Sequence, residues 1–550
     1  MFKGVPYAES PINESRFGRP KEKKPWDNSW DCTNYQSNCP NISPVSLTNA
    51  NGSEDCLYLN VLANKKCFDN KCPVMFYIHG GSFYFGFPLE IKEEEIIEKY
   101  VSKNVIFVTL AYRENIFGFP NFVNTFVNKN HVNLGFYDIL QALKFINQNI
   151  NRMGGNHKNV TVMGNSSGAS AVLYLISSPA VEPGLFSQAW VSSPMPYVSP
   201  ARNVDMTTVV TKSVGCGEIN PKNTVASLNI LSCLKKIPEK VLTEAVFNGL
   251  KQYEWTHTGP QTEEILFPVQ SFDQLLKWWK PTRLWISTTT DEMSIESSQS
   301  NLHMCQHYCG IFGYTKPTTL AFCAKNFDNR RRKIVQAYHA LGLRLAEVND
   351  KAGGQSYLEL FGQDGHTGHA NDLTFVIGWH KNGSLNESDS VLDREYRQWL
   401  VNFAYGEDPN LDFKPFSLVN QGFYYVNYTV SNGTVLNQPK MIWNRPLDAK
   451  ANQFWLTDLA FIENPEAFNT SYSTTTYSTP HSHTKPTLPH PIEKNRTFNY
   501  HFMTFLLLFL TLLLLALVIL LLWNRLHYRP KTTIYVDTAS ERTPLIQTDN

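Results

Sequence analysis

A short turn rich in glycine and serine constrains the fold of this chain more than any other segment. Residues 164–168 read GNSSG and fit the pattern G-x-S-x-G. The apolar run Val160–Met163 before them is typical of a buried strand, and residues 169–177 after them have apolar side chains at helical spacing. Flanking glycines permit a sharp turn, and a helix N-terminus behind it favours negative charge. The sequence therefore predicts a strand–serine–helix turn that lifts Ser166 above the edge of a sheet.

The segments around this turn predict an α/β architecture. Val74–His79 and Val105–Leu110 are short apolar runs of the kind found in buried parallel strands. Tyr137–Asn151 has apolar residues at helical spacing and precedes two glycines that would end a helix. Strands that alternate with helices form a mostly parallel sheet with helices on both faces. Because 49 Lys and Arg side chains balance 48 Asp and Glu side chains, the charge indicates no nucleic-acid partner.

Candidates for a base and an acid follow the serine in the chain. A serine nucleophile needs both, and in α/β-hydrolases the order is serine, acid, histidine. Two acids, Asp291 and Glu292, stand together in the segment WISTTTDEMS. Two histidines, His366 and His369, stand in the segment GQDGHTGHANDLTFV. The local patterns do not choose between the two acids or between the two histidines.

A second glycine-rich turn, HGGSF at residues 79–83, follows a predicted strand upstream. Such a turn can present backbone N–H groups to an oxyanion, together with the N–H of Ser167. Taken alone, a glycine-rich turn of this kind is equally typical of an ordinary strand end. Combined with the serine turn, it predicts an oxyanion-binding site.

In their order along the chain, these segments resemble the type-B carboxylesterase/cholinesterase family of α/β-hydrolases. The similarity is collinear from residue 2 to residue 410. It implies an α/β-hydrolase fold with a large, mostly parallel central sheet. The matching stretches are FKGVPYAESPINESRFGRP, SEDCLYLNV, YIHGGSFYFG, LAYRENIFGF, NLGFYDILQALKFINQNINRMGGNHKNVTVMGNSSGAS, GLFSQAWVSS, TTTDEMS, GHANDLTF and WLVNFAYGEDPN.

The resemblance assigns roles that the local patterns leave open. It implies that Ser166 is the nucleophile, Glu292 the acid and His369 the general base. It also implies that the backbone amides of Gly81, Ser82 and Ser167 form the oxyanion hole. Two disulfides are implied as well, Cys39 with Cys56 and Cys216 with Cys233. The chain departs from the family pattern at Asn165 and Ser167, where glutamate and alanine are usual. The resemblance implies no cofactor.

These roles predict a serine hydrolase that cleaves small-molecule carboxylic esters through an acyl-enzyme. The loop from Cys39 to Cys56 is short and lacks a tryptophan, so the cation site of acylcholine-cleaving relatives is not expected. One alternative is an acyltransferase that moves the acyl group to a small-molecule alcohol or glycoside, as in membrane-anchored relatives of the nematode gut. A second alternative is a neuroligin-like adhesion protein, which the complete serine, acid and histidine set disfavours.

The segment HMCQHYC at residues 303–309 has a spacing that a metal could use. In an oxidising lumen Cys305, Cys309 and Cys323 more often form disulfides, so we expect no metal there. The partners of the remaining cysteines are not defined by the sequence: Cys32, Cys67 and Cys72.

The C-terminal residues predict a membrane anchor after an enzyme domain of residues 1–462. We expect a Ser-, Thr- and Pro-rich stalk over residues 463–501. Phe502–Trp523 is uncharged and, as a helix, long enough to cross a bilayer. Basic residues after it place residues 524–550 in the cytosol. In this tail, Glu541–Ile546 resembles an acidic dileucine signal that sorting adaptors bind.

This layout predicts a single-pass protein whose catalytic domain is lumenal or extracellular, at the cell surface or in an endosome or lysosome-related organelle. Sequons for N-glycosylation support a lumenal or extracellular domain. Among them are Asn13, Asn41, Asn386, Asn427 and Asn432. No apolar leader follows Met1. We therefore expect the natural start, with a signal peptide and the first strands of the domain, to lie upstream.

Overall fold

The structure of the protein is a computed structural model. It describes residues 1–26, 29–41, 52–86, 91–122, 129–198, 200–220, 222–253, 259–292, 300–379 and 383–466. Met1–Thr474 forms one compact unit. The expected membrane span Phe502–Trp523, the cytosolic tail and the stalk from residue 467 onward lie outside the described residues. Among the helices that are described, none has both the length and the apolar character needed to cross a bilayer.

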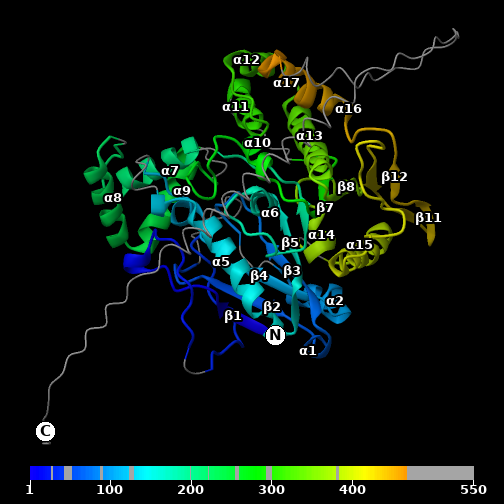
Figure 1. Cartoon of the computed structure of the whole chain (residues 1–550), viewed down its shortest axis with the longest axis horizontal. Coiled ribbons are helices and arrows are strands. Elements are labelled where there is room, and N and C mark those ends of the chain that lie inside the picture. Colours follow the sequence, from blue (N-terminus) through cyan, green and yellow to red (C-terminus); the bar gives the residue numbers. More distant parts are fainter. Residues whose placement is uncertain are drawn as a thin grey trace, which may run out of the picture. The chain divides into compact units, whose positions relative to one another are not determined.

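A large mixed sheet runs through this unit (Figure 1). Within the described residues it has ten strands in the order β1-β2-β4-β3-β5-β6-β7-β8-β9-β12. The strands from β4 to β9 in this order are parallel, whereas β1, β2 and β12 run antiparallel at the two edges. The predicted α/β architecture with a mostly parallel sheet is confirmed. The strands are β1 Phe2–Pro6, β2 Tyr58–Leu62, β3 Cys72–Ile78, β4 Ile106–Leu110, β5 Gly155–Asn165, β6 Gln188–Ser192, β7 Arg283–Thr289, β8 Gln355–Phe361, β9 Phe423–Val426 and β12 Lys440–Ile442.

Helices cover both faces of the sheet, because alternate residues of each buried strand point to opposite faces. On β3, Val74 and Phe76 join an apolar cluster with α5, α6 and α13. Met75 and Tyr77 join a different cluster with α2, α14 and α15. The helices that bear on the site are α2 Glu93–Lys99, α5 Leu134–Asn149, α6 Ser167–Ser177, α13 Arg330–Lys351, α14 Leu373–Ile377 and α15 Glu387–Tyr405.

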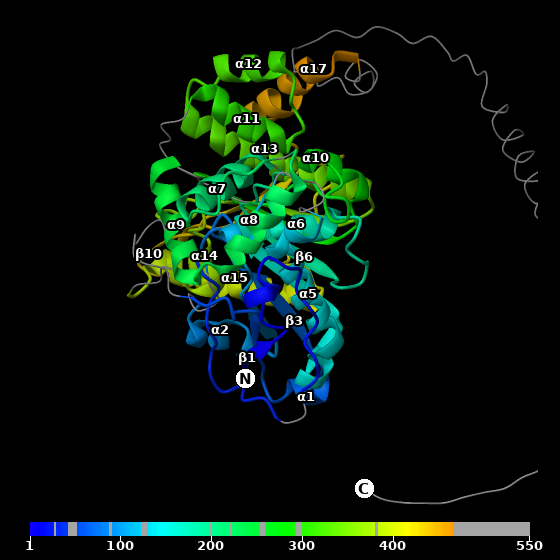
Figure 2. The same cartoon turned by 90° about the vertical axis from the view of Figure 1, so that its left-hand side faces the viewer.

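Further helices lie beyond the edges of the sheet. Figures 1 and 2 both show α11, α12 and α17 side by side at one end of the unit, beyond the end of α13. A separate two-stranded sheet is formed by β10 Thr429–Ser431 and β11 Thr434–Asn437. Within the described residues, the remaining α-helices of four residues or more are α1 Cys67–Asn70, α3 Asn115–Gly118, α7 Pro200–Ser213, α8 Thr224–Lys236, α9 Glu239–Tyr253, α10 Phe272–Leu275, α11 Asn301–Ile311, α12 Pro317–Lys325 and α17 Leu459–Glu463.

The strand before the serine turn is longer than its apolar run predicts. β5 begins at Gly155, whereas apolar residues begin only at Val160. The side chains between these two points are polar and mostly lie at least partly in solvent. Hydrophobic periodicity therefore gives no signal for the first half of this strand.

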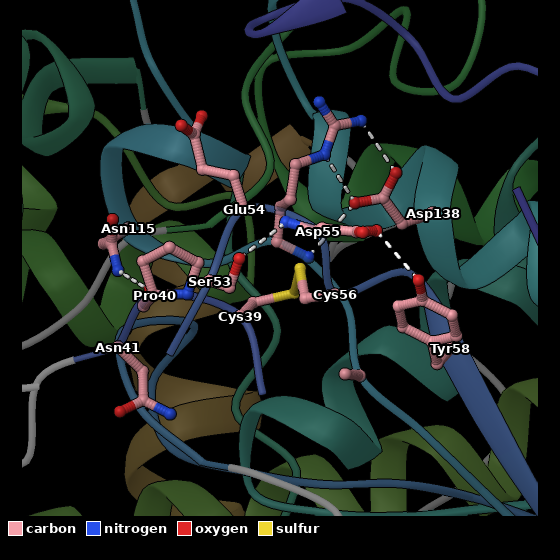
Figure 3. Close-up of a disulfide and its surroundings, with 12 residues drawn as sticks. Cys39, Pro40, Asn41, Ser53, Glu54, Asp55, Cys56, Tyr58, Asn115 and Asp138 are labelled. Carbon is pink, nitrogen blue, oxygen red and sulfur yellow. Dashed lines mark hydrogen bonds and ion pairs between the residues drawn. A yellow bond between two sulfur atoms is a disulfide. The ribbon is translucent and has the colours of Figure 1, made fainter. Parts of the chain in front are cut away.

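Four disulfides cross-link the described residues, and two of them are the pairs that the family resemblance implies. The bridges are Cys39–Cys56, Cys67–Cys72, Cys216–Cys233 and Cys305–Cys323. Beside the first of these bridges, the Asn115 side chain donates to the carbonyl oxygen of Pro40 at 2.9 Å (Figure 3). Cys305 is bonded to sulfur, so it is not available as a metal ligand. Disulfides form and persist in oxidising compartments, so these four bridges indicate an extracellular or lumenal location for the domain.

Candidate active site

Ser166 occupies the predicted turn between β5 and α6. Its backbone has φ 56° and ψ −123°, a conformation that is rare for a residue other than glycine. The turn is closed by a hydrogen bond from the Ser166 N–H to the Ser192 carbonyl oxygen at 2.9 Å. A Cβ atom on Gly164 would lie 2.4 Å from the backbone of Gly168, so glycine is required for this close approach. The geometry is that of a nucleophile elbow.

Four consecutive parallel strands bring polar residues to the same edge of the sheet. Ser166 follows β5, Ser193 follows β6, Glu292 comes after β7, and His369 comes after β8. The carboxyl ends of neighbouring parallel strands are where ligands bind in open α/β sheets. Hydrogen bonds also connect this edge, since the Ser193 N–H donates to the Ser287 carbonyl oxygen of β7 at 2.8 Å.

Glu292 and His369 form a hydrogen-bonded pair. The Nδ1 atom of His369 lies 2.6 Å from Oε2 of Glu292, whose side chain is fully buried. The other carboxylate oxygen accepts from the Ser193 hydroxyl at 2.5 Å and from the Thr289 N–H at 2.9 Å. Burial alone would raise the pKa of Glu292, but His369, Ser193 and the Thr289 amide outweigh it and lower the pKa below its ordinary value. Glu292 is therefore held as a carboxylate that orients the imidazole.

The other two candidates have different partners. Asp291 forms an ion pair with Arg331 at the start of α13. His366 lies 3.1 Å from the carboxylate of Asp389 on α15. Asp291 still joins the two loops, because its N–H donates to the Thr367 carbonyl oxygen at 2.9 Å and it pairs with Gly368 as an isolated parallel bridge. Of the acids and histidines that the local patterns left open, the structure thus brings together Glu292 and His369.

The predicted oxyanion turn lies directly against the elbow. Gly81, Ser82 and Phe83 have positive φ values of 114°, 56° and 58° in succession, so the chain turns sharply here. A Cβ atom on Gly80 would lie 2.7 Å from the Asn165 carbonyl oxygen, which shows how closely the two segments approach. The Phe83 N–H donates to the Ser167 hydroxyl at 3.3 Å, so the two segments are also bonded to each other.

A buried acidic pair behind the site was not predicted. Asp372 accepts from the Ser192 hydroxyl at 2.5 Å, and that hydroxyl in turn accepts from the Asn165 side chain at 3.1 Å. Burial raises the pKa of Asp372 to about 6. Burial also raises the pKa of Glu359, on β8, to about 8. Asp372 follows His369 closely in the sequence, but no local pattern indicates that its side chain turns back beneath the elbow.

Residues 1–341 of this chain match a family model that is described as "Carboxylesterase family". This range includes Ser166 and Glu292, and His369 lies beyond it. Gut esterase 1 of Caenorhabditis briggsae is 31% identical over 283 residues, which are 50% of this chain and 47% of the relative. Juvenile hormone esterase of Tribolium castaneum is 34% identical over 254 residues, which are 45% of this chain and 41% of the relative. The chain spans about half the length, or less, of these curated relatives.

The solved structure of juvenile hormone esterase from Manduca sexta, which has OTFP covalently attached, is similar with a TM-score of 0.66. The two chains are 21% identical, and the similarity covers 84% of this chain and 95% of that chain. At this identity the similarity establishes the fold alone. The family model, however, covers well over half of the chain, and the chain therefore belongs to the carboxylesterase family.

Proposed function

We propose that the protein is a serine hydrolase that cleaves carboxylic esters through an acyl-enzyme intermediate. The observation that carries this proposal is the 2.6 Å hydrogen bond between Glu292 and His369 at the same sheet edge as the elbow serine Ser166. A histidine oriented by a buried carboxylate is the arrangement that activates a serine hydroxyl. Several relatives with similar sequences are themselves named esterases.

In the proposed mechanism, Nε2 of His369 accepts the proton of Ser166 as the serine oxygen attacks the ester carbonyl. The carboxylate of Glu292 stabilises the imidazolium that forms. The N–H groups of Gly81, Ser82 and Ser167 stabilise the oxyanion of the tetrahedral intermediate, each by roughly 3 kcal/mol as in comparable sites. The alcohol leaves with the proton from His369, and water releases the acid from the serine by the reverse sequence of proton transfers.

The substrate class proposed is a neutral ester of a small molecule. No tryptophan lies in the loop closed by Cys39 and Cys56 that could bind a quaternary ammonium group. Acyl transfer to an alcohol would use the same acyl-enzyme, but no observation of the structure favours it over hydrolysis. An adhesion role without catalysis would not require the hydrogen-bonded Glu292 and His369 behind a strained serine.

We also propose, from the sequence alone, that the domain is held at a membrane by Phe502–Trp523, with the Ser- and Thr-rich segment 463–501 as stalk and the tail 524–550 in the cytosol. The tail motif Glu541–Ile546 would then bind a sorting adaptor that directs the protein to endosomes or lysosome-related organelles. The disulfides of the domain support its lumenal or extracellular side of this arrangement.

The test of the catalytic proposal is active-site labelling of the full chain with a fluorophosphonate probe, combined with hydrolysis of short-chain p-nitrophenyl esters. We expect the protein to be labelled and active, and Ser166→Ala to lose both properties. Ser177→Ala is the matched control, because Ser177 is a buried serine at the other end of α6 whose hydroxyl donates to the Leu173 carbonyl oxygen. Folded protein that is neither labelled nor active, or equal labelling of Ser166→Ala, would contradict the proposal.

A further inference from the structure

The sequon asparagines of the described residues differ in what their side chains do. Asn427 is buried, and its Nδ2 donates to the Gly362 carbonyl oxygen at 2.9 Å. Asn41 is buried and donates to a backbone carbonyl at 3.2 Å. Asn386 caps α15, since its Oδ1 accepts from the Asp389 N–H and its Nδ2 donates to the Asp389 carboxylate, both at 2.8 Å. A sugar on any of these nitrogens would crowd a contact that holds the fold.

Asn432 differs because its side chain is exposed at the tip of a hairpin. β10 and β11 are joined by Asn432 and Gly433, whose φ values of 50° and 73° are those of a two-residue hairpin turn. The turn is tied to α15 through the backbone, because the Gly433 N–H donates to the Glu387 carboxylate at 2.5 Å. Asn13 is also exposed, but it begins a 3-10 helix, Asn13–Ser15, that contacts α8. Lys235 of α8 donates to the Glu14 carbonyl oxygen at 2.6 Å.

The domain also belongs to the compartment in which sequons are modified. Disulfides persist in the secretory pathway and outside the cell, where N-glycosylation takes place on exposed Asn-X-Ser/Thr segments. We propose that Asn432 is an N-glycosylation site and that Asn427, five residues earlier in the same segment, is not. In this modification the Asn432 side-chain nitrogen loses a proton and bonds to the anomeric carbon of an oligosaccharide carried by a lipid pyrophosphate, and the lipid pyrophosphate leaves.

A glycan on Asn432 would lie next to exposed apolar side chains of β11. On β11 the side chains of Val435 and Leu436 are 48% and 66% exposed. This strand belongs to a sheet of two strands, so within the described residues its apolar side chains have little to pack against. Exposed apolar side chains on an edge strand favour association with other chains. A glycan on Asn432, at the adjoining turn, would shield them.

The test is a map of sequon occupancy in the full chain, produced in insect cells behind a cleavable secretory leader. Only the fraction in which Cys39 and Cys56 are oxidised is used, so that every molecule has entered the lumen. The glycans are removed enzymatically in ¹⁸O-water, which converts an occupied asparagine into labelled aspartate. Chymotryptic cleavage after Tyr428 places Asn427 and Asn432 on different peptides.

We expect label at Asn432 in most molecules and none at Asn427. Asn432→Gln and Thr434→Ala should each remove one glycan from the intact protein, and Thr434→Ser should retain it, because the sequon survives. The Thr434 variants separate loss of the acceptor signal from loss of the asparagine itself. Label at Asn427, or disulfide-bonded protein whose Asn432 is unlabelled, would overturn the proposal, and neither result bears on the esterase activity.

Discussion

The backbone N–H of Phe83 lies 3.3 Å from the hydroxyl oxygen of Ser167 and donates to it. This bond joins the loop of residues 81–83 to the first residue of α6, and both segments supply proposed oxyanion donors. Its acceptor is a hydroxyl that the alanine usual in the family would not provide. The bond therefore offers a way to test how firmly the oxyanion loop must be held.

Ser167→Ala keeps the backbone N–H of residue 167 and removes only the hydroxyl. We expect kcat to fall about tenfold, or ~1.4 kcal/mol, which is the order of one net hydrogen bond. KM should change little, because the loop matters most once charge develops on the oxygen. Affinity for a trifluoromethyl ketone, which forms an oxyanion adduct with serine, should fall by the same factor. Unchanged kcat and ketone affinity would show that the bond does not position the loop.

The two adjacent acids offer a matched pair of variants. Glu292→Gln preserves shape but removes the charge that stabilises the imidazolium, so kcat should fall by roughly 10⁴-fold, as for the equivalent change in other serine enzymes. Asp291→Asn alters only the exposed ion pair with Arg331, and such pairs contribute little. Its kcat should stay close to that of the unmodified protein. Steady-state kinetics on one ester measures both, and the reverse order of effects would exclude Glu292 as the acid.

The buried carboxyl group of Glu359 should make the free energy of unfolding depend on pH. It accepts hydrogen bonds from Trp285, Ser287 and Tyr396 at 2.8–2.9 Å, and burial raises its pKa to about 8. The folded state therefore holds this proton more tightly than the unfolded state does. The stabilisation is complete below the ordinary carboxyl pKa and is lost as the pH rises through about 8.

Glu359→Gln should remove this component. Between about pH 5 and pH 8, the free energy of unfolding should fall less steeply with pH for the variant than for the unmodified protein. Urea unfolding at a series of pH values measures the two slopes. Glu407→Gln, at an exposed position, serves as the control and should keep the original slope. Identical slopes for Glu359→Gln would show that the buried carboxyl does not titrate in this range.

The Cys39–Cys56 bridge closes a segment with a sequence separation of 17. Replacing both cysteines by alanine should lower the free energy of unfolding by about 3 kcal/mol, because the unfolded chain regains the freedom that the loop removes. Denaturant unfolding under non-reducing conditions is the measurement. Cys32→Ser removes a free thiol and should leave stability nearly unchanged. A double variant as stable as Cys32→Ser would assign the bridge no structural role.

Local patterns in the sequence predicted the parts of the fold that depend on neighbouring residues. The apolar run of β3 and the glycine-flanked turn at Ser166 carry their own signals, because strand burial and turn sterics are local. The choice between Asp291 and Glu292 is different, since it depends on Arg331 and His369, far along the chain. The resemblance to a family supplied that choice, whereas the patterns alone did not.

Contacts between residues far apart in the sequence could not be predicted from local patterns. The bond from Ser192 to Asp372 joins residues 180 positions apart. Such contacts require the sheet order, and a single sequence does not state which strands will be neighbours.

The bridge between Asp291 and Gly368 has a mechanical consequence. Because backbone pairing ties the segment that carries the acid to the segment that carries the imidazole, the two side chains are displaced together by thermal motion. The distance that can vary is then the one between this pair of segments and the elbow that carries Ser166. Substitutions that change the contacts between β6 and β7, where the Ser193 N–H donates to the Ser287 carbonyl oxygen and the Ser193 hydroxyl donates to Glu292, should therefore shift the acid and the imidazole together relative to Ser166.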